Sequence, residues 1–199
     1  MGARFSQYTA ELATGGTVAP GEDQRFLYVL QGSVRVGEHL LEPGGYAFLP
    51  EGTALALVAM EPSRITVIEK PYDAVEEVDE PRIVIGTEQT VVAQPLMNDP
   101  WLEVRTLLPS GPEFDCAVNT MTFRPGASLP IVEVHVMEHG LLMLEGSGIY
   151  RLGDCWYPVH AGDFIWMAPY CPQWFAAIGK TPAKYLLYKD WNRGPWAGS

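Results

Sequence analysis

One arrangement of apolar runs and glycines occurs twice in the 199 residues, and it limits the possible folds more than any other feature. Residues 26–33, FLYVLQGS, are matched by residues 141–147, LLMLEGS. Residues 41–50, LEPGGYAFLP, are matched by residues 159–169, VHAGDFIWMAP. In each copy a short apolar run ends at a glycine, and a second apolar run follows a glycine turn and ends at a proline. A pattern duplicated in this way predicts two copies of one structural unit.

The apolar runs themselves predict strands. In the first half they are short, rich in β-branched and aromatic residues, and spaced about ten residues apart between turn residues. The 20 glycines and 17 prolines suit a chain that turns this often. No segment carries a sustained 3.6-residue apolar stripe, which a helix would show. The sequence therefore predicts an all-β protein, either a sandwich or a barrel.

Charge and hydropathy narrow the possible partners. The net charge of −11 is the wrong sign for binding a phosphate backbone, so we expect no nucleic acid. The longest apolar run, residues 54–60, is far shorter than a membrane span, and the first residues lack a signal-peptide core. We therefore expect no membrane partner and a cytoplasmic location. Cys116, Cys155 and Cys171 are an odd number without CxxC spacing, so we expect buried free thiols.

The duplicated pattern resembles that of the cupins, and the resemblance covers nearly the whole chain. It implies two jelly-roll barrels in one polypeptide, a bicupin. We expect the barrels at residues 1–72 and 98–199. Residues 73–97 would join them as an acidic linker followed by connecting strands at 82–85 and 90–93, because five acidic residues fall within 73–80.

Cupins hold a metal on residues at fixed offsets from these glycines. Counting back 13, 11 and 7 residues from Gly146 and forward 11 from Gly162 gives the candidate ligands of the second half: Glu133, His135, His139 and Gln173. The same offsets from Gly32 and Gly44 in the first half give Ala19, Gly21, Arg25 and Leu55. The first barrel thus offers no ligand, and Arg25 would repel a cation. We expect one metal site, in the second barrel.

Strand geometry supports this second-half set. Alternate residues of a strand share a face, so Glu133 and His135 would both point into the barrel, and His139 would rejoin them after a short irregular stretch. Two imidazoles, a carboxylate and an amide oxygen suit Fe(II) or Mn, and leave Mn, Fe, Ni and Zn open. One anionic ligand leaves the divalent site at a net charge of +1, which favours a small chelating acid as substrate. We expect Glu138 to face solvent.

The order of the ligands resembles one cupin family more closely. Most cupins place two histidines before the glutamate, whereas here Glu133 precedes both and Gln173 replaces the usual last histidine. This set is similar to that of the (S)-ureidoglycine aminohydrolases, manganese bicupins of purine (allantoin) catabolism. Segments 123–128, 146–150 and 162–167 add to the resemblance. It implies Mn²⁺ on the four ligands, a homo-oligomer, and conversion of (S)-2-ureidoglycine, a small anionic ureide, to (S)-ureidoglycolate and ammonia.

The resemblance also implies roles for further residues. Substrate binding would fall to Tyr150, Tyr185, Lys189 and Glu133, with Lys189 as the catalytic residue. If residues 184–189 form a strand, Tyr185 and Lys189 share one face, so their joint placement in the barrel is geometrically allowed. A lysine beside a cationic site should have a lowered pKa, which suits proton transfer near neutrality.

Two other functions fit the same predicted site. One is an Fe(II) dioxygenase acting on a small acid, and the other is a non-catalytic bicupin that binds a small acid. Members of the resembled family carry more chain before the first repeat than the roughly 25 residues that precede Phe26 here. We therefore expect a shortened first barrel. His39 and His160 have no partner residues at ligand offsets, and we expect them in turns or on the surface.

Overall fold

The computed structural model describes residues 2–193, so residue 1 and residues 194–199, at the outer ends of the two expected barrels, lie outside the described residues. The chain divides into two compact units. The first comprises residues up to 91 together with 111–115, and the second comprises 92–110 and the chain from 116 onward. Among the described residues the only helical element is a 3-10 turn, η1 (Glu88–Thr90), and no helix is long and apolar enough to cross a membrane. The all-β prediction is confirmed.

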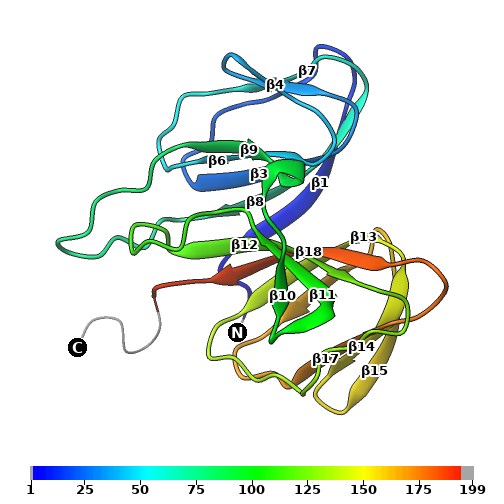
Figure 1. The fold of residues 1–199 in the computed structure, drawn as a ribbon. Coiled ribbons are helices and arrows are strands. Elements are labelled where there is room, and N and C mark those ends of the chain that lie inside the picture. Colours follow the sequence, from blue (N-terminus) through cyan, green and yellow to red (C-terminus); the bar gives the residue numbers. More distant parts are fainter. Residues whose placement is uncertain (1, 194–199) are drawn as a thin grey trace. The chain divides into compact units, whose positions relative to one another are not determined.

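The first unit is built from two antiparallel sheets (Figure 1). One sheet contains, in spatial order, β1 (Ser6–Leu12), β8 (Ser63–Lys70), β3 (Gln24–Gln31), β6 (Gly45–Leu49) and β9 (Val84–Thr87). The other contains β2 (Thr17–Val18), β7 (Leu57–Ala59), β4 (Val34–Val36) and β5 (His39–Leu41). Buried residues of both sheets, including Leu27, Val34 and Val67, form one core between them. The apolar runs predicted as strands therefore face inward because they supply this core.

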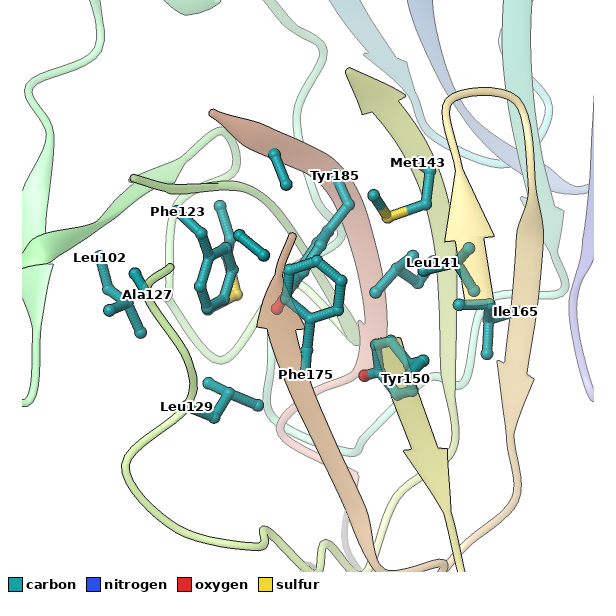
Figure 2. Packing of buried hydrophobic residues seen from close by; sticks show 14 of the residues in the cluster. Leu102, Phe123, Ala127, Leu129, Leu141, Met143, Tyr150, Ile165, Phe175 and Tyr185 are labelled. Atoms are coloured by element: carbon teal, nitrogen blue, oxygen red, sulfur yellow. The ribbon is translucent and has the colours of Figure 1, made fainter. Parts of the chain in front are cut away.

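The second unit repeats the arrangement. Its larger sheet contains β10 (Gln94–Leu96), β11 (Asp99–Thr106), β12 (Cys116–Phe123), β18 (Ala183–Asp190), β13 (His139–Glu145) and β16 (Phe164–Met167). Its smaller sheet contains β15 (Cys155–His160), β14 (Ser147–Leu152) and β17 (Gln173–Ala177). The core between the sheets is aromatic at its centre: the rings of Phe123, Phe175 and Tyr185 lie 4.9 to 5.5 Å apart (Figure 2). Two sheets packed around one core in each unit confirm the bicupin.

The duplicated glycines have the same physical reason in both units. Gly32 and Gly146 end equivalent strands with φ of +74° and +71°, a conformation that side-chain-bearing residues rarely adopt. A Cβ would lie 2.4 Å from the carbonyl oxygen of Pro62 at Gly32, and 2.4 Å from that of Pro182 at Gly146. Only glycine fits both the backbone conformation and the close approach. The repeat in the sequence therefore reflects one turn built twice.

The segment between the repeats differs in detail from the expectation. The strand predicted at 90–93 is wrong: η1 ends at Thr90, and the extended residues that follow pair only from Gln94 onward, in β10. The turn forms because the amide of Val91 donates to the carbonyl of Glu88 and the amide of Glu88 donates to that of Gly44. Residues 82–85 lead into β9, which pairs with β6 in the first unit, whereas β10 pairs with β11 in the second.

Candidate metal centre

The segment that carries the first two candidate ligands is not a regular strand. Glu133 forms an isolated antiparallel bridge with Gln173, through amide-to-carbonyl bonds of 2.8 and 2.9 Å, and the amide of Tyr170 donates to His135 at 2.7 Å. The strand expected through 133–135 is therefore wrong. Val134 and Val136 are 56% and 42% exposed, so the alternating pattern has no sheet face to bury them. The bridge nevertheless brings Glu133 beside Gln173, which is 40 residues further along the chain.

His139 lies at the start of β13 and is almost fully buried. Its Nδ1 is 3.1 Å from the carbonyl oxygen of Met137, so Nδ1–H donates there and Nε2 keeps its lone pair. The pKa of His139 is lowered to about 3, mainly by burial, and the neighbouring charges of His135 and Lys189 act in the same direction. The neutral imidazole, with Nε2 available, is the form that binds a metal ion.

The four candidate ligands lie together in the second unit. His135 Nε2 is 3.4 Å from Glu133 Oε2, and the rings of His135 and His139 have centroids 4.8 Å apart. Gln173 joins them through its bridge to Glu133. Within residues 2–193 no cluster of three or more His, Cys, Asp and Glu side chains has metal-holding geometry. With Gln173 as the fourth candidate, a donor set of two nitrogens and two oxygens would fit a divalent cation.

Lys189 lies beside this group. On β18 it is opposite His139 of β13 on one side and Ala117 of β12 on the other. Burial lowers the pKa of Lys189, and the charge of Glu133 acts in the opposite direction, so the Glu133 carboxylate lies close enough to the ammonium to affect it. The expected lowering of this pKa is therefore present, with burial as its largest cause. Its Nζ lies 4.5 Å from the ring centroid of Trp191, in a cation–π contact.

Trp191 was missed by the sequence reasoning. The signal was available, because positions 185, 187, 189 and 191 continue one alternation and therefore tend to share a face. A strand predicted only for residues 184–189 does not include Trp191. The tryptophan belongs to the surroundings of the site because its ring packs on the lysine ammonium.

The two tyrosines are buried in the core of the second unit, each 2% exposed (Figure 2). Figure 2 shows Tyr150 on β14 and Tyr185 on β18, both directed into the cluster that contains Phe175. The Tyr150 hydroxyl donates to Gln173 Oε1 at 3.3 Å and lies 3.1 Å from the sulfur of Met167. Burial raises the pKa of both hydroxyls, so both remain protonated donors. Tyr150 therefore contacts a candidate ligand directly.

The same register position differs between the two units. Arg25 of β3 is opposite Glu69 of β8, as His139 of β13 is opposite Lys189 of β18. Arg25 donates from Nε to Glu69 Oε1 at 2.6 Å and from Nη1 to the carbonyl of Ala19 at 2.7 Å. An internal ion pair thus occupies this position in the first unit. In the second unit the neutral imidazole of His139 faces Lys189, so the positive charge that can attract an anion is the Lys189 ammonium.

Glu138 corrects one expectation. It is 1% exposed rather than solvent-facing, and its Oε2 accepts a hydrogen bond from the indole Nε1 of Trp166 at 2.8 Å. Because it precedes His139 directly, its side chain leaves the opposite face of the chain from the imidazole.

The remaining expectations on cysteines and histidines are partly met. All three cysteines are free, but only Cys116 is buried, whereas Cys155 is exposed and Cys171 is half-buried. The prediction of buried thiols is therefore wrong for those two. His39 and His160 are exposed, as expected.

Comparison with known proteins agrees with the fold. Residues 119–188 match a family described as "Cupin domain", and residues 2–72 match a family described as "EutQ-like cupin domain". A probable (S)-ureidoglycine aminohydrolase of rice (Oryza sativa subsp. japonica) is 43% identical over 98% of this chain and 65% of its own length. This chain therefore spans about two thirds of that relative.

Two bacterial proteins are similar over more of their length. The (S)-ureidoglycine aminohydrolase of Escherichia coli (strain K12) is 33% identical over 97% of this chain and 78% of its own. The crystal structure of a glyoxylate-induced protein from Pseudomonas aeruginosa superposes with a TM-score of 0.86 at 37% identity, over 96% of this chain and 75% of that one. Since identity and coverage are this high along both cupin units, the chain belongs to the (S)-ureidoglycine aminohydrolase family of bicupins.

Proposed function

We propose that this chain is a metal-dependent aminohydrolase that converts (S)-2-ureidoglycine and water to (S)-ureidoglycolate and ammonia, in purine (allantoin) catabolism. The names of the relatives support the reaction. The observation that carries the proposal is the meeting of Glu133, His135, His139, Gln173 and Lys189 in one barrel. In the first barrel the ion pair of Arg25 and Glu69 occupies the equivalent position, so we assign that barrel a structural role.

The proposed cofactor is Mn²⁺, held by Glu133, His135, His139 and Gln173. The mixed set of nitrogen and oxygen donors supports this choice, because carboxylate and amide oxygens suit Mn²⁺ and imidazole tolerates it. When bound, the cation supplies a positive centre that anchors and polarises the substrate. The hydrogen bond from Tyr150 to Gln173 Oε1 would fix the orientation of the amide that provides the oxygen donor.

Lys189 would move the protons of the reaction. As the bond between C2 and the amino nitrogen breaks, Nζ gives a proton to that nitrogen, which leaves as ammonia. Water adds at C2 and returns a proton to Nζ, so the lysine ends as it began. The lowered pKa of Lys189 supports this exchange, because an amine whose pKa lies closer to neutral pH both gives and takes a proton readily. Tyr185 would orient the substrate through its protonated hydroxyl.

Ammonia release from freshly generated ureidoglycine, with Mn²⁺ added, tests the proposal. The substrate decays spontaneously, so Glu133→Ala protein provides the background rate. We expect fast release by the natural sequence, background release by Glu133→Ala, and background release with retained Mn²⁺ by Lys189→Ala. The assay is repeated without oxygen, which an aminohydrolase does not need. Release at the background rate from Mn²⁺-loaded protein would reject the reaction, and full turnover by Lys189→Ala would reject the role of that lysine.

We also propose that the chain acts as a homo-oligomer in the cytoplasm and binds neither nucleic acid nor membranes. Support for self-association comes from aromatic side chains that are about half exposed in the second unit: Trp156, Tyr157 and Phe164. Sedimentation equilibrium of the Mn²⁺-loaded protein tests this, and a mass of one chain at all concentrations would reject it.

A further inference from the structure

Asn119 is a buried polar residue with no assigned role. It lies on β12 and is 9% exposed. Its Oδ1 is inaccessible to solvent and has no hydrogen-bond partner among the residues that the structure describes. Buried side-chain amides in native proteins are paired in the large majority of cases, so an orphaned acceptor needs an explanation. A bound molecule that supplies the missing donor is one such explanation.

The strand register places Asn119 on the interior face of the second unit. Met121 and Phe123 belong to the core of that unit, and by alternation Asn119 shares their face. On the adjacent strand β18, Leu187 is opposite Asn119 and Lys189 is opposite Ala117. Asn119 is therefore a diagonal neighbour of Lys189, at a spacing that side chains can bridge.

The residues directly opposite Asn119 on the two adjacent strands supply no hydrogen bond to its Oδ1 in the described structure. Leu187 on one side has no donor, and Thr106 of β11 on the other side makes no hydrogen bond to it in the described structure. In one direction along the interior face, the next opposed pair on β13 and β18 is His139 and Lys189, which are polar. In the other direction, the next opposed pair on β12 and β18 is Met121 and Tyr185. Asn119 thus lies at the boundary between the apolar core and the candidate site.

A second orphaned group lies beside Lys189. The indole Nε1 of Trp191 is buried without a hydrogen-bond partner among residues 2–193, while its ring contacts the Lys189 ammonium. An acceptor and a donor that both lack partners among the described residues thus lie beside the same lysine. A ligand that fills both needs must itself carry an N–H donor and a carbonyl or carboxylate acceptor.

We infer that Asn119 is a specificity-determining residue that binds the ureido group of the substrate. Its Oδ1 accepts a hydrogen bond from a ureido N–H, and its Nδ2 donates to the ureido carbonyl oxygen. A carboxamide and a ureido group are complementary in this way, because each presents one donor next to one acceptor. The inference rests on the proposed function, since it assumes that a ureido acid occupies the second barrel.

Binding of two stable ligands to Mn²⁺-loaded protein tests the inference without turnover. Ureidoacetate carries the ureido group but no amino group to release, and glycolate carries only the acid end. In Asn119→Leu, a variant of similar size, we expect ureidoacetate to bind about 10- to 100-fold more weakly, as for a lost pair of hydrogen bonds. Glycolate affinity and Mn²⁺ content should stay within about twofold. Thr106→Val, in the same row but exposed, should change neither affinity.

Thermal unfolding of the ligand-free protein separates recognition from a structural role. Because Oδ1 has no hydrogen-bond partner in the part of the chain that the structure describes, Asn119→Leu should unfold at an equal or higher temperature than the natural sequence. If leucine does not fit at this position, Asn119→Ser, which is smaller and polar, is used for the same measurement of ureidoacetate affinity. Unchanged ureidoacetate affinity, or an equal loss for glycolate, would overturn the inference. Ureido-dependent binding without ammonia release would instead reject the proposed reaction and leave the recognition standing.

Discussion

Substituting Tyr150 by phenylalanine isolates one hydrogen bond to a candidate metal ligand. The hydroxyl donates to Gln173 Oε1 over 3.3 Å, and the side chain is otherwise packed in an apolar core that phenylalanine can fill. Removing a group that orients a metal ligand weakens metal binding about 10- to 100-fold. The observed bond is longer than the usual O–H···O distance of about 2.7–2.8 Å, so we expect the low end, about tenfold. That factor corresponds to about 1.4 kcal/mol.

Mn²⁺ titration followed by electron paramagnetic resonance measures this effect. Tyr185→Phe is the matched control, because Tyr185 is equally buried and contacts aromatic rings rather than a candidate ligand. We expect its Mn²⁺ affinity to stay within about twofold of the natural sequence. Equal affinities for the two variants would refute the reasoning that Tyr150 acts through Gln173. A tenfold loss in both would show instead that any hydroxyl removed from this core disturbs the site.

Two further predictions concern stability. Gly146→Ala should lower the free energy of unfolding by about 2–5 kcal/mol, because the new Cβ both strains the left-handed backbone and lies 2.4 Å from a carbonyl oxygen. Gly153→Ala, with φ of +58° and open space around it, should cost only about 1–2 kcal/mol. Urea unfolding compares the two variants, and equal losses would contradict the effect of the close contact at Gly146. In the metal-free protein, His139 should lower stability as the pH falls from 6.5 towards about 3, because the unfolded chain binds a proton there that the folded chain does not. Urea midpoints across this range should depend less on pH in His139→Gln, and an unchanged slope would reject the assignment.

Local pattern was sufficient for the strands of the duplicated segments and for the turns that end them. Gly32 and Gly146 show why: the requirement for positive φ, and for room beside a carbonyl, acts on the residue itself and therefore appears in the sequence. The four candidate ligands could be found for a related reason. Their offsets from the repeated glycines follow from resemblance to cupins, and the contrast between the halves identified which barrel offers donors.

Local pattern failed where the environment of a residue is made by distant chain. Glu138 looks like a surface carboxylate in sequence, yet it is buried with the indole of Trp166, 28 residues away. The Val134 and Val136 alternation looks like a strand, yet the described backbone contacts of this segment are the bridge between Glu133 and Gln173 and the hydrogen bond from Tyr170 to His135. Hydrogen-bond partners of this kind depend on which segments become neighbours, and spacing within one segment does not specify that.

The amino-acid sequence was enough to predict an all-β chain of two related barrels, and it supplied four candidate donors for a metal site in one of them. Period-two alternation and the special conformations of glycine are local properties, so they can be read along the chain. Only the tertiary structure decided that β12, β18 and β13 lie side by side. That order sets Lys189 opposite His139 and leaves the nearby amide oxygen of Asn119 buried and without a hydrogen-bond partner among residues 2–193. The physical reason is that pairing between strands distant in sequence fixes the polar environment of each side chain.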